Sequence, residues 1–100
     1  MEKADLIFKI GTIRREKNLS ARALSLKIDM HESYINRLES QKDFLPSLDV
    51  FFRILEECGC SAEKFFYHDY ANYESDMEIL QMFKNLPPEK RQNLIGLLKN

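Results

Sequence analysis

The sequence predicts an all-α protein, and three observations support this fold class. Apolar residues recur at three- and four-residue spacing in several segments, which is the period of amphipathic helices. Serine and asparagine residues stand at the boundaries of these segments, where they cap or end helices. No segment has the alternating pattern of a β-strand. The length of 100 residues fits a single core, so we expect one helical domain with an extension.

The first helix is expected over residues 5–17. Its apolar stripe consists of Leu6, Ile10 and Ile13. Gly11 destabilises a helix by roughly 1 kcal/mol relative to alanine, and we expect the space beside it to admit a neighbouring helix. Asn18 readily adopts the left-handed conformation that ends a helix.

Two short helices follow, over residues 21–28 and 31–40, with a turn at Asp29–Met30. Ser20 is a good N-cap for the first of them. Asp29 is expected to be left-handed, which costs about 1 kcal/mol for a residue other than glycine. The apolar residues that join the two helices are Leu24, Ile28, Ile35 and Leu38. The polar residues of the second helix then face outward.

The fourth helix has the clearest amphipathic pattern in the chain. Ser47 is its expected N-cap, and Gly59 is expected to end it. Its predicted core face consists of Leu48, Phe51, Phe52, Leu55 and Cys58. Ser61 then caps a short fifth helix. These five helices account for residues 1–70, which form the first predicted domain.

Residues 71–100 form the second predicted unit, a two-helix extension. One helix is expected over residues 74–86, while Pro88 disfavours helix at the residue before it and opens another helix. Both helices have wider apolar faces than one small domain needs. We therefore expect the extension to join two copies of the chain through Met77, Leu80, Phe83, Leu94, Leu97 and Leu98. The alternative is that it packs on the domain of residues 1–70.

The composition excludes several classes of protein. No segment approaches the run of about 20 apolar residues that spans a membrane, and the N-terminus lacks the pattern of a signal peptide, so we expect a cytoplasmic protein that does not bind membranes. Cys58, Cys60 and His68 are too few to hold a metal ion, and no disulfide scaffold is expected. The chain has no glycine-rich phosphate loop, HExxH motif or nucleophile elbow. We expect neither a cofactor nor enzymatic activity.

The charge is distributed unevenly along the chain, whose formal net charge is −1. Residues 9–42 contain eight lysine or arginine residues and four acidic ones, so this segment carries +4 and the remainder carries −5. A local positive field attracts phosphate even on an acidic protein, although less strongly than a uniformly basic surface does. The helix pair within residues 19–39, with its exposed polar second helix, is the usual arrangement for placing side chains in a DNA groove.

Residues at characteristic spacing link this helix pair to a known family. They are Arg14 in the first helix, Leu19, Ser20, Leu24, Ile35 and Glu39 in the helix pair, and Pro46, Ser47, Phe51 and Leu55 at the fourth helix. In these residues the chain resembles the lambda-repressor-like (Cro/cI, Xre) helix-turn-helix family over about its first two thirds. The resemblance implies an all-α, five-helix lambda-repressor-like DNA-binding domain, here with a C-terminal two-helix extension. Such domains act on operator DNA, usually as dimers, with the third helix in the major groove.

The resemblance also implies which residues contact double-stranded DNA. The base contacts would come from Glu32, Ser33, Asn36 and Arg37 on the third helix. Asparagine bonds adenine in bidentate fashion, serine bonds several base edges, and glutamate accepts from the cytosine amino group. The phosphate contacts, which position the protein without reading sequence, would come from Arg22, Tyr34 and Lys42. Arg37 also suits a phosphate, and the alternative for Tyr34 is half-buried packing.

A structural role is implied for Arg14 and Glu39. In the family, the corresponding residues form a salt bridge that joins the first helix to the end of the third and holds the third helix in place. We therefore expect neither residue to contact DNA. Ser25 stands where the family has a small alanine and still allows close helix packing. His31 stands where the family has a serine that caps the third helix.

Two departures from the family pattern leave a second function open. Ala21 replaces a glutamine that touches the DNA backbone, and Glu32 places a negative charge near the phosphates. The primary hypothesis is a sequence-specific transcriptional regulator that acts as a homodimer on operator DNA through the helix at residues 31–40. The alternative is a protein-interaction module, antitoxin-like or an adaptor, that retains the helix-turn-helix fold with weak or no DNA binding.

Overall fold

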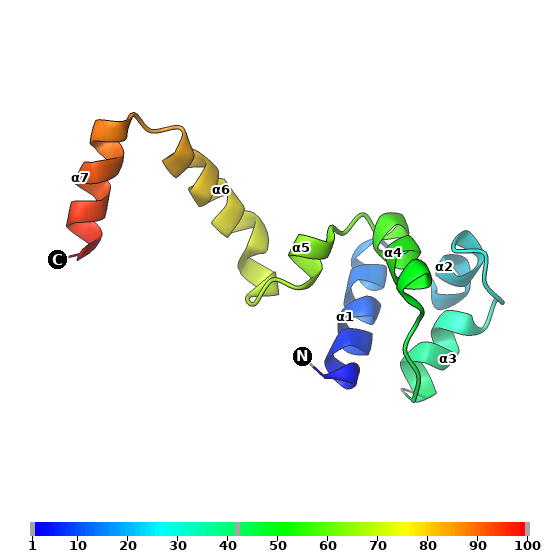
Figure 1. Ribbon diagram of the computed structural model, residues 1–100. Helices are drawn as coiled ribbons and strands as arrows, with labels where there is room; N and C mark the ends of the chain where they lie inside the picture. Colours follow the sequence, from blue (N-terminus) through cyan, green and yellow to red (C-terminus); the bar gives the residue numbers. More distant parts are fainter. Residues whose placement is uncertain (1, 42, 100) are drawn as a thin grey trace. The chain divides into compact units, whose positions relative to one another are not determined.

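The computed structural model describes residues 2–41 and 43–99, and these residues form helices and no strand. The chain divides into two compact units, Met1–Phe66 and Tyr67–Asn100. The helices in chain order are α1 (Lys3–Glu16), α2 (Ala21–Lys27), α3 (Tyr34–Gln41), α4 (Leu48–Glu57), α5 (Ala62–Phe65), the 3-10 helix η1 (Tyr70–Asn72), α6 (Tyr73–Lys84) and α7 (Pro88–Lys99) (Figure 1). The predicted all-α class is confirmed.

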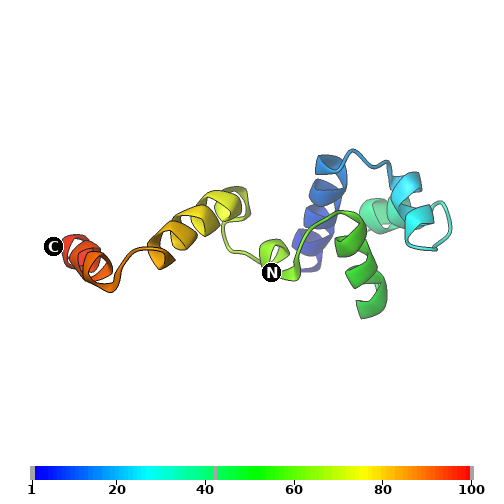
Figure 2. The same cartoon turned by 90° about the horizontal axis from the view of Figure 1, so that it is seen from above.

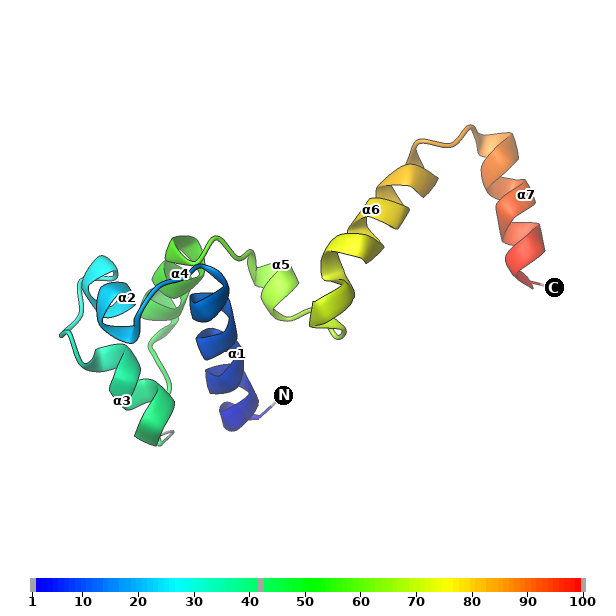
Figure 3. The same cartoon turned by 180° about the vertical axis from the view of Figure 1, so that it is seen from behind.

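Helices α1 to α5 enclose one apolar core in the first unit. Helix α3 packs against both α1 and α2, and α4 packs against α2. Figure 3 shows α2 and α3 side by side, with α1 and α4 close to them. The fully buried apolar side chains are Ile7, Ile10, Ile13, Leu24, Ile28, Ile35, Leu38, Ile54 and Phe65. The four residues predicted to join α2 and α3 are all among them.

Serine hydroxyl groups cap three helices as the sequence predicts. Ser20 Oγ accepts from Ala23 N at 3.0 Å, and Ser47 Oγ accepts from Val50 N at 3.2 Å. Ser61 Oγ accepts from Lys64 N at 3.1 Å. Each bond satisfies an amide that has no partner within its own helix.

The three predicted left-handed positions are also present. The φ angles of Asn18, Asp29 and Gly59 are 60°, 60° and 63°. Each residue lies directly beyond a helix end and reverses the chain there. The short connections α1–α2, α2–α3 and α4–α5 are thereby fixed by local sequence.

Two predicted core faces need correction. In α1, Ile7 is buried together with the predicted Ile10 and Ile13, whereas Leu6 is only half-buried. In α4, Leu48 and Phe52 are 69% and 51% exposed, whereas Val50 and Ile54 are buried. Helix α4 is apolar on more than one side, so the sequence does not determine which side faces the core. Packing against α2 selects the side that contains Ile54.

The second unit has no buried residue among those described. Its helices α6 and α7 are joined by a short connection (Figure 2). At the start of α6, Tyr67 Oη donates to Asp76 Oδ2 at 2.7 Å, and the Tyr67 and Tyr73 rings meet edge to face at 5.1 Å. Pro88 opens α7 as predicted. None of the described helices has the length and apolar character required to span a membrane.

A groove of about 580 Å³ runs along α6 and α7 within the second unit. Its lining consists of Asp76, Ile79, Leu80, Met82, Phe83, Leu86, Leu94 and Leu98. Four of the six predicted dimerisation residues therefore lie in the groove. The other two, Met77 and Leu97, do not line it. An apolar groove in a unit without a core leaves much apolar surface in contact with solvent.

Candidate nucleic-acid interface

The turn between α2 and α3 is closed by backbone hydrogen bonds. Asp29 N donates to Leu26 O at 3.1 Å, and Met30 N donates to Ser25 O at 2.9 Å. These bonds satisfy carbonyl groups at the end of α2, which have no helical partner of their own. Arg53 of α4 adds a third bond from Nη1 to Ile28 O at 2.7 Å. The turn is therefore held from two sides.

Helix α3 begins at Tyr34, three residues later than predicted. His31 is the cause, because Ser33 N donates to its Nδ1 at 3.1 Å and Ser33 Oγ lies 2.8 Å from the same nitrogen. Such local bonds offer the backbone an alternative to a helical turn. The prediction that Glu32 and Ser33 lie within the helix is wrong, and both precede it. Asn36 lies on the helix, as predicted.

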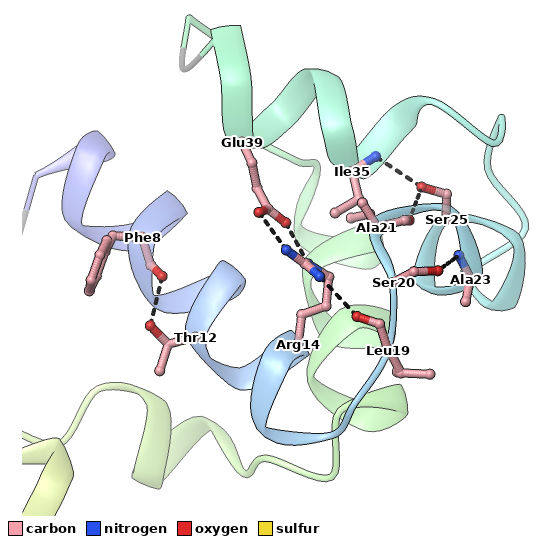
Figure 4. Close-up of polar contacts among 10 residues, drawn as sticks. All are labelled: Phe8, Thr12, Arg14, Leu19, Ser20, Ala21, Ala23, Ser25, Ile35 and Glu39. Carbon is pink, nitrogen blue, oxygen red and sulfur yellow. Dashed lines mark hydrogen bonds and ion pairs between the residues drawn. The ribbon is translucent and has the colours of Figure 1, made fainter.

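Ser25 connects α2 to the first turn of α3. Its hydroxyl is fully buried, donates to Ala21 O at 2.7 Å and accepts from Ile35 N at 3.0 Å (Figure 4). The Ile35 amide lies in the first turn of α3 and has no partner in its own helix. From the sequence we expect only close packing at this position. A polar residue at a core position is the sequence signal that could have predicted these hydrogen bonds, since buried polar groups need hydrogen-bond partners.

Arg14 and Glu39 form a bidentate ion pair between α1 and α3. Arg14 Nε lies 2.8 Å from Glu39 Oε2, and Nη2 lies 3.0 Å from Oε1. Arg14 Nη1 also donates to Leu19 O at 2.9 Å (Figure 4). The two side chains are 13% and 20% exposed, and the hydrogen bond with Glu39 raises the pKa of Arg14. This is the pair that the family resemblance implies.

Gly11 explains how α3 approaches α1 at this ion pair. A Cβ atom at position 11 would lie 3.2 Å from Glu39 Oε1 and 3.1 Å from Arg15 Nη1. Both distances are shorter than ordinary van der Waals contact. The missing side chain therefore leaves room for the carboxylate of α3, in the place where the sequence predicts a close neighbour.

The outer face of α3 is polar and accessible. Ile35 and Leu38 point into the core, whereas Asn36 and Arg37 are exposed. Neither the Asn36 nor the Arg37 side chain forms a hydrogen bond or ion pair with another residue in the part of the chain that the structure describes. A ligand can therefore reach these two side chains without breaking a polar contact with any described residue.

A model of the helix-turn-helix family matches residues 10–65. The chain belongs to this helix-turn-helix family. The match extends from the middle of α1 to the end of α5, which confirms the resemblance to Cro/cI- and Xre-type domains. It supports a DNA-binding regulatory function. The second unit lies outside the match. Neither a search of curated proteins nor a search of solved structures found a match.

An ion pair within the helix-turn-helix domain joins two predicted DNA contacts to each other. Arg22 Nε lies 3.2 Å from Glu32 Oε2, and the side chains are 70% and 55% exposed. The family resemblance implies a separate DNA contact for each residue, and the sequence does not predict that they meet. The sequence signal for this ion pair is weak, because opposite charges ten positions apart meet only when the turn between α2 and α3 brings the starts of the two helices together.

The remaining predicted contacts differ in their surroundings. The half-buried Tyr34 ring packs edge to face on Phe44 at 5.9 Å, and burial raises the pKa of its hydroxyl. This geometry favours the packing alternative for Tyr34. The Ser33 hydroxyl is in contact with His31. Lys42 lies outside the described residues.

The two cysteines of the helix-turn-helix domain are buried thiols. Burial, and next the neighbouring Cys60, raise the pKa of the Cys58 thiol to about 11. The prediction that Cys58 is a small core residue is confirmed. Within residues 2–41 and 43–99, no group of three histidine, cysteine or acidic residues has a geometry suited to a metal ion.

Proposed function

We propose that the protein is a sequence-specific transcriptional regulator that binds operator DNA as a homodimer. The observation that carries this proposal is the exposed polar face of α3 on a firmly braced helix. Asn36 and Arg37 project from it, while Ile35 and Leu38 anchor it in the core. A helix held in this way presents its side chains to the major groove with fixed geometry.

The roles of individual residues follow from their chemistry. Asn36 bonds adenine, while Ser33 and Glu32 approach base edges from the turn that precedes α3. Arg37 contacts a base or a phosphate. Arg22 and Lys42 would contact phosphates, whereas the packing of Tyr34 on Phe44 favours a structural role for Tyr34. The proposal includes no enzymatic activity, cofactor or metal.

The second unit is proposed to join two copies of the chain. None of its described residues is buried, and Leu97 and Leu98 are 74% and 77% exposed. The charges favour a symmetric arrangement, because acidic residues predominate on α6 and basic residues on α7. A two-fold dimer places α6 of one copy beside α7 of the other. On operator DNA, the two copies of α3 would occupy successive major grooves, about 34 Å apart.

Light scattering on the full chain tests the dimer. Wild type is expected to have twice the mass of the chain at tens of micromolar, and Leu98→Asp is expected to be a monomer. Leu98 is exposed within a single chain, so this substitution alters association rather than folding. Gln92→Asp, at another exposed position of α7, is the control and should remain a dimer. A monomeric wild type would contradict the dimer.

Fluorescence anisotropy with labelled duplexes tests DNA binding. We expect binding that weakens steeply with salt, because each phosphate contact releases counterions. Non-specific binders reach dissociation constants of about 10⁻⁴–10⁻⁶ M at physiological salt. The absence of binding to any duplex at about 10 μM protein and low salt would exclude the proposed function.

The same experiment decides between this function and a protein-interaction module. The Arg22–Glu32 ion pair favours that second function, because it neutralises one of the predicted phosphate contacts. A module of this kind would keep the helix-turn-helix fold and bind another protein through its apolar surfaces. It would bind duplex DNA weakly or not at all.

A further inference from the structure

We propose that Arg22 and Glu32 exchange partners when the protein binds its operator, an inference that rests on the proposed function. At a matching site, Glu32 leaves Arg22 and accepts a hydrogen bond from a cytosine amino group. Arg22 then turns to a backbone phosphate. On other DNA, Glu32 finds no such donor, so the pair acts against binding to non-matching sequences.

The position of the ion pair supports this exchange. Arg22 lies in the first turn of α2 and Glu32 in the turn before α3. The pair therefore bridges the starts of the two helices that a helix-turn-helix domain presents to DNA. Asn36 and Arg37, which follow Glu32 by four and five residues, are exposed as well. Any duplex bound to this face lies close to both charges.

The strength of the contact allows it to be exchanged. Arg22 and Glu32 form a single contact, from Arg22 Nε to Glu32 Oε2 at 3.2 Å, and their side chains are 70% and 55% exposed. Ion pairs of this kind contribute little because water screens them. The two terminal nitrogens of Arg22 have no hydrogen-bond partner among the described residues. Arg22 can therefore transfer to a phosphate without loss of any other contact.

The two kinds of DNA differ in what happens to Glu32. If Arg22 moves to a phosphate on non-matching DNA, the Glu32 carboxylate stays beside the phosphates without a counter-charge. Repulsion between two like unit charges about 4 Å apart in water lowers the affinity roughly fivefold. On matching DNA, the cytosine amino group offsets this repulsion. Specificity then arises partly from weaker binding to the wrong sequences.

Glu32→Ala tests the exchange, with Glu56→Ala as a control of equal charge change. Glu56 is exposed on α4, outside the proposed interface. The probes are a duplex that the wild-type full chain selects from a random pool and a shuffled duplex of equal length. Anisotropy measures both affinities at two salt concentrations for each protein.

For Glu32→Ala we expect about fivefold tighter binding to the shuffled duplex and equal or weaker binding to the selected duplex. The ratio of the two affinities then falls at least fivefold, whereas Glu56→Ala leaves it within twofold. Arg22→Ala should weaken binding to the selected duplex more than to the shuffled duplex, because Arg22 gains its phosphate contact where Glu32 has left it for a base.

Other outcomes overturn the proposal. If Glu32→Ala lowers both affinities equally, Glu32 merely holds Arg22 in position. If it raises both affinities equally, Glu32 is only a general repulsive charge. If neither affinity changes, Glu32 has no role in DNA binding. These results leave the proposed function intact. The separate result that wild type selects and binds no duplex would reject the proposed function itself.

Discussion

Replacing Ser25 with alanine is expected to destabilise the domain and loosen the start of α3. The Ser25 hydroxyl is fully buried, donates to Ala21 O at 2.7 Å and accepts from Ile35 N at 3.0 Å. Alanine keeps the backbone and most of the packing but removes the acceptor. The buried Ile35 amide is then left without its partner, directly beside the residues proposed to read DNA.

Two effects of opposite sign determine the size of the change. A buried N–H that loses its acceptor costs about 1–3 kcal/mol. Alanine has a higher helix propensity than serine, which offsets at most about 0.7 kcal/mol. The free energy of unfolding should therefore fall by about 1–2 kcal/mol.

Urea denaturation followed by circular dichroism measures the loss of stability. Amide hydrogen exchange at Ile35 reports the local effect, and its protection should fall more than that of Leu24 in α2. Ser40→Ala, at an exposed position of α3, is the control and should change stability by less than about 0.5 kcal/mol. An equally small change for Ser25→Ala, with unchanged protection of the Ile35 amide, would refute the role of this hydroxyl.

Three further predictions concern the ion pair, a buried thiol and the proposed base contacts. Arg14→Lys keeps the charge but cannot form the bidentate contact with Glu39, so urea denaturation should show a loss of about 1–3 kcal/mol; unchanged stability would contradict its bracing role. Burial raises the Cys58 pKa from 9.0 to about 11, so the unfolded state loses this proton first and stability falls as pH rises from 9 to 11. Urea titrations should show that Cys58→Ala removes at most about 2.7 kcal/mol of this decline, and an identical decline would argue against the shift. In competition binding, Asn36→Ala should change the preferred base at one position by roughly 1–3 kcal/mol, whereas Arg37→Ala should weaken binding to all duplexes; equal weakening by Asn36→Ala would argue against base reading.

Local sequence signals predicted the framework of the first unit. The three serine caps and the left-handed residues at the ends of α1, α2 and α4 depend on neighbouring residues in the chain, so the sequence contains the required information. The apolar residues of α2 and α3 repeat with helical period and lie on a single face. Their burial was therefore predicted correctly.

The errors arose where tertiary contacts or competing local bonds decide the structure. Helix α4 has apolar residues on more than one side, and packing on α2 buries Ile54 while Phe52 stays exposed. The start of α3 was predicted too early because His31 and Ser33 form their own turn. The Arg22–Glu32 contact depends on how two helices meet, which periodicity does not reveal.

Selection of bound duplexes from a random pool by the full chain is the most direct test of the proposed function. A dimer that reads DNA through α3 predicts an enriched sequence with two half-sites related by two-fold symmetry. Their centres should lie about 10–10.5 base pairs apart, which is one turn of the double helix. Enrichment of no sequence, together with no binding at low salt, would contradict the account and favour a protein-interaction module.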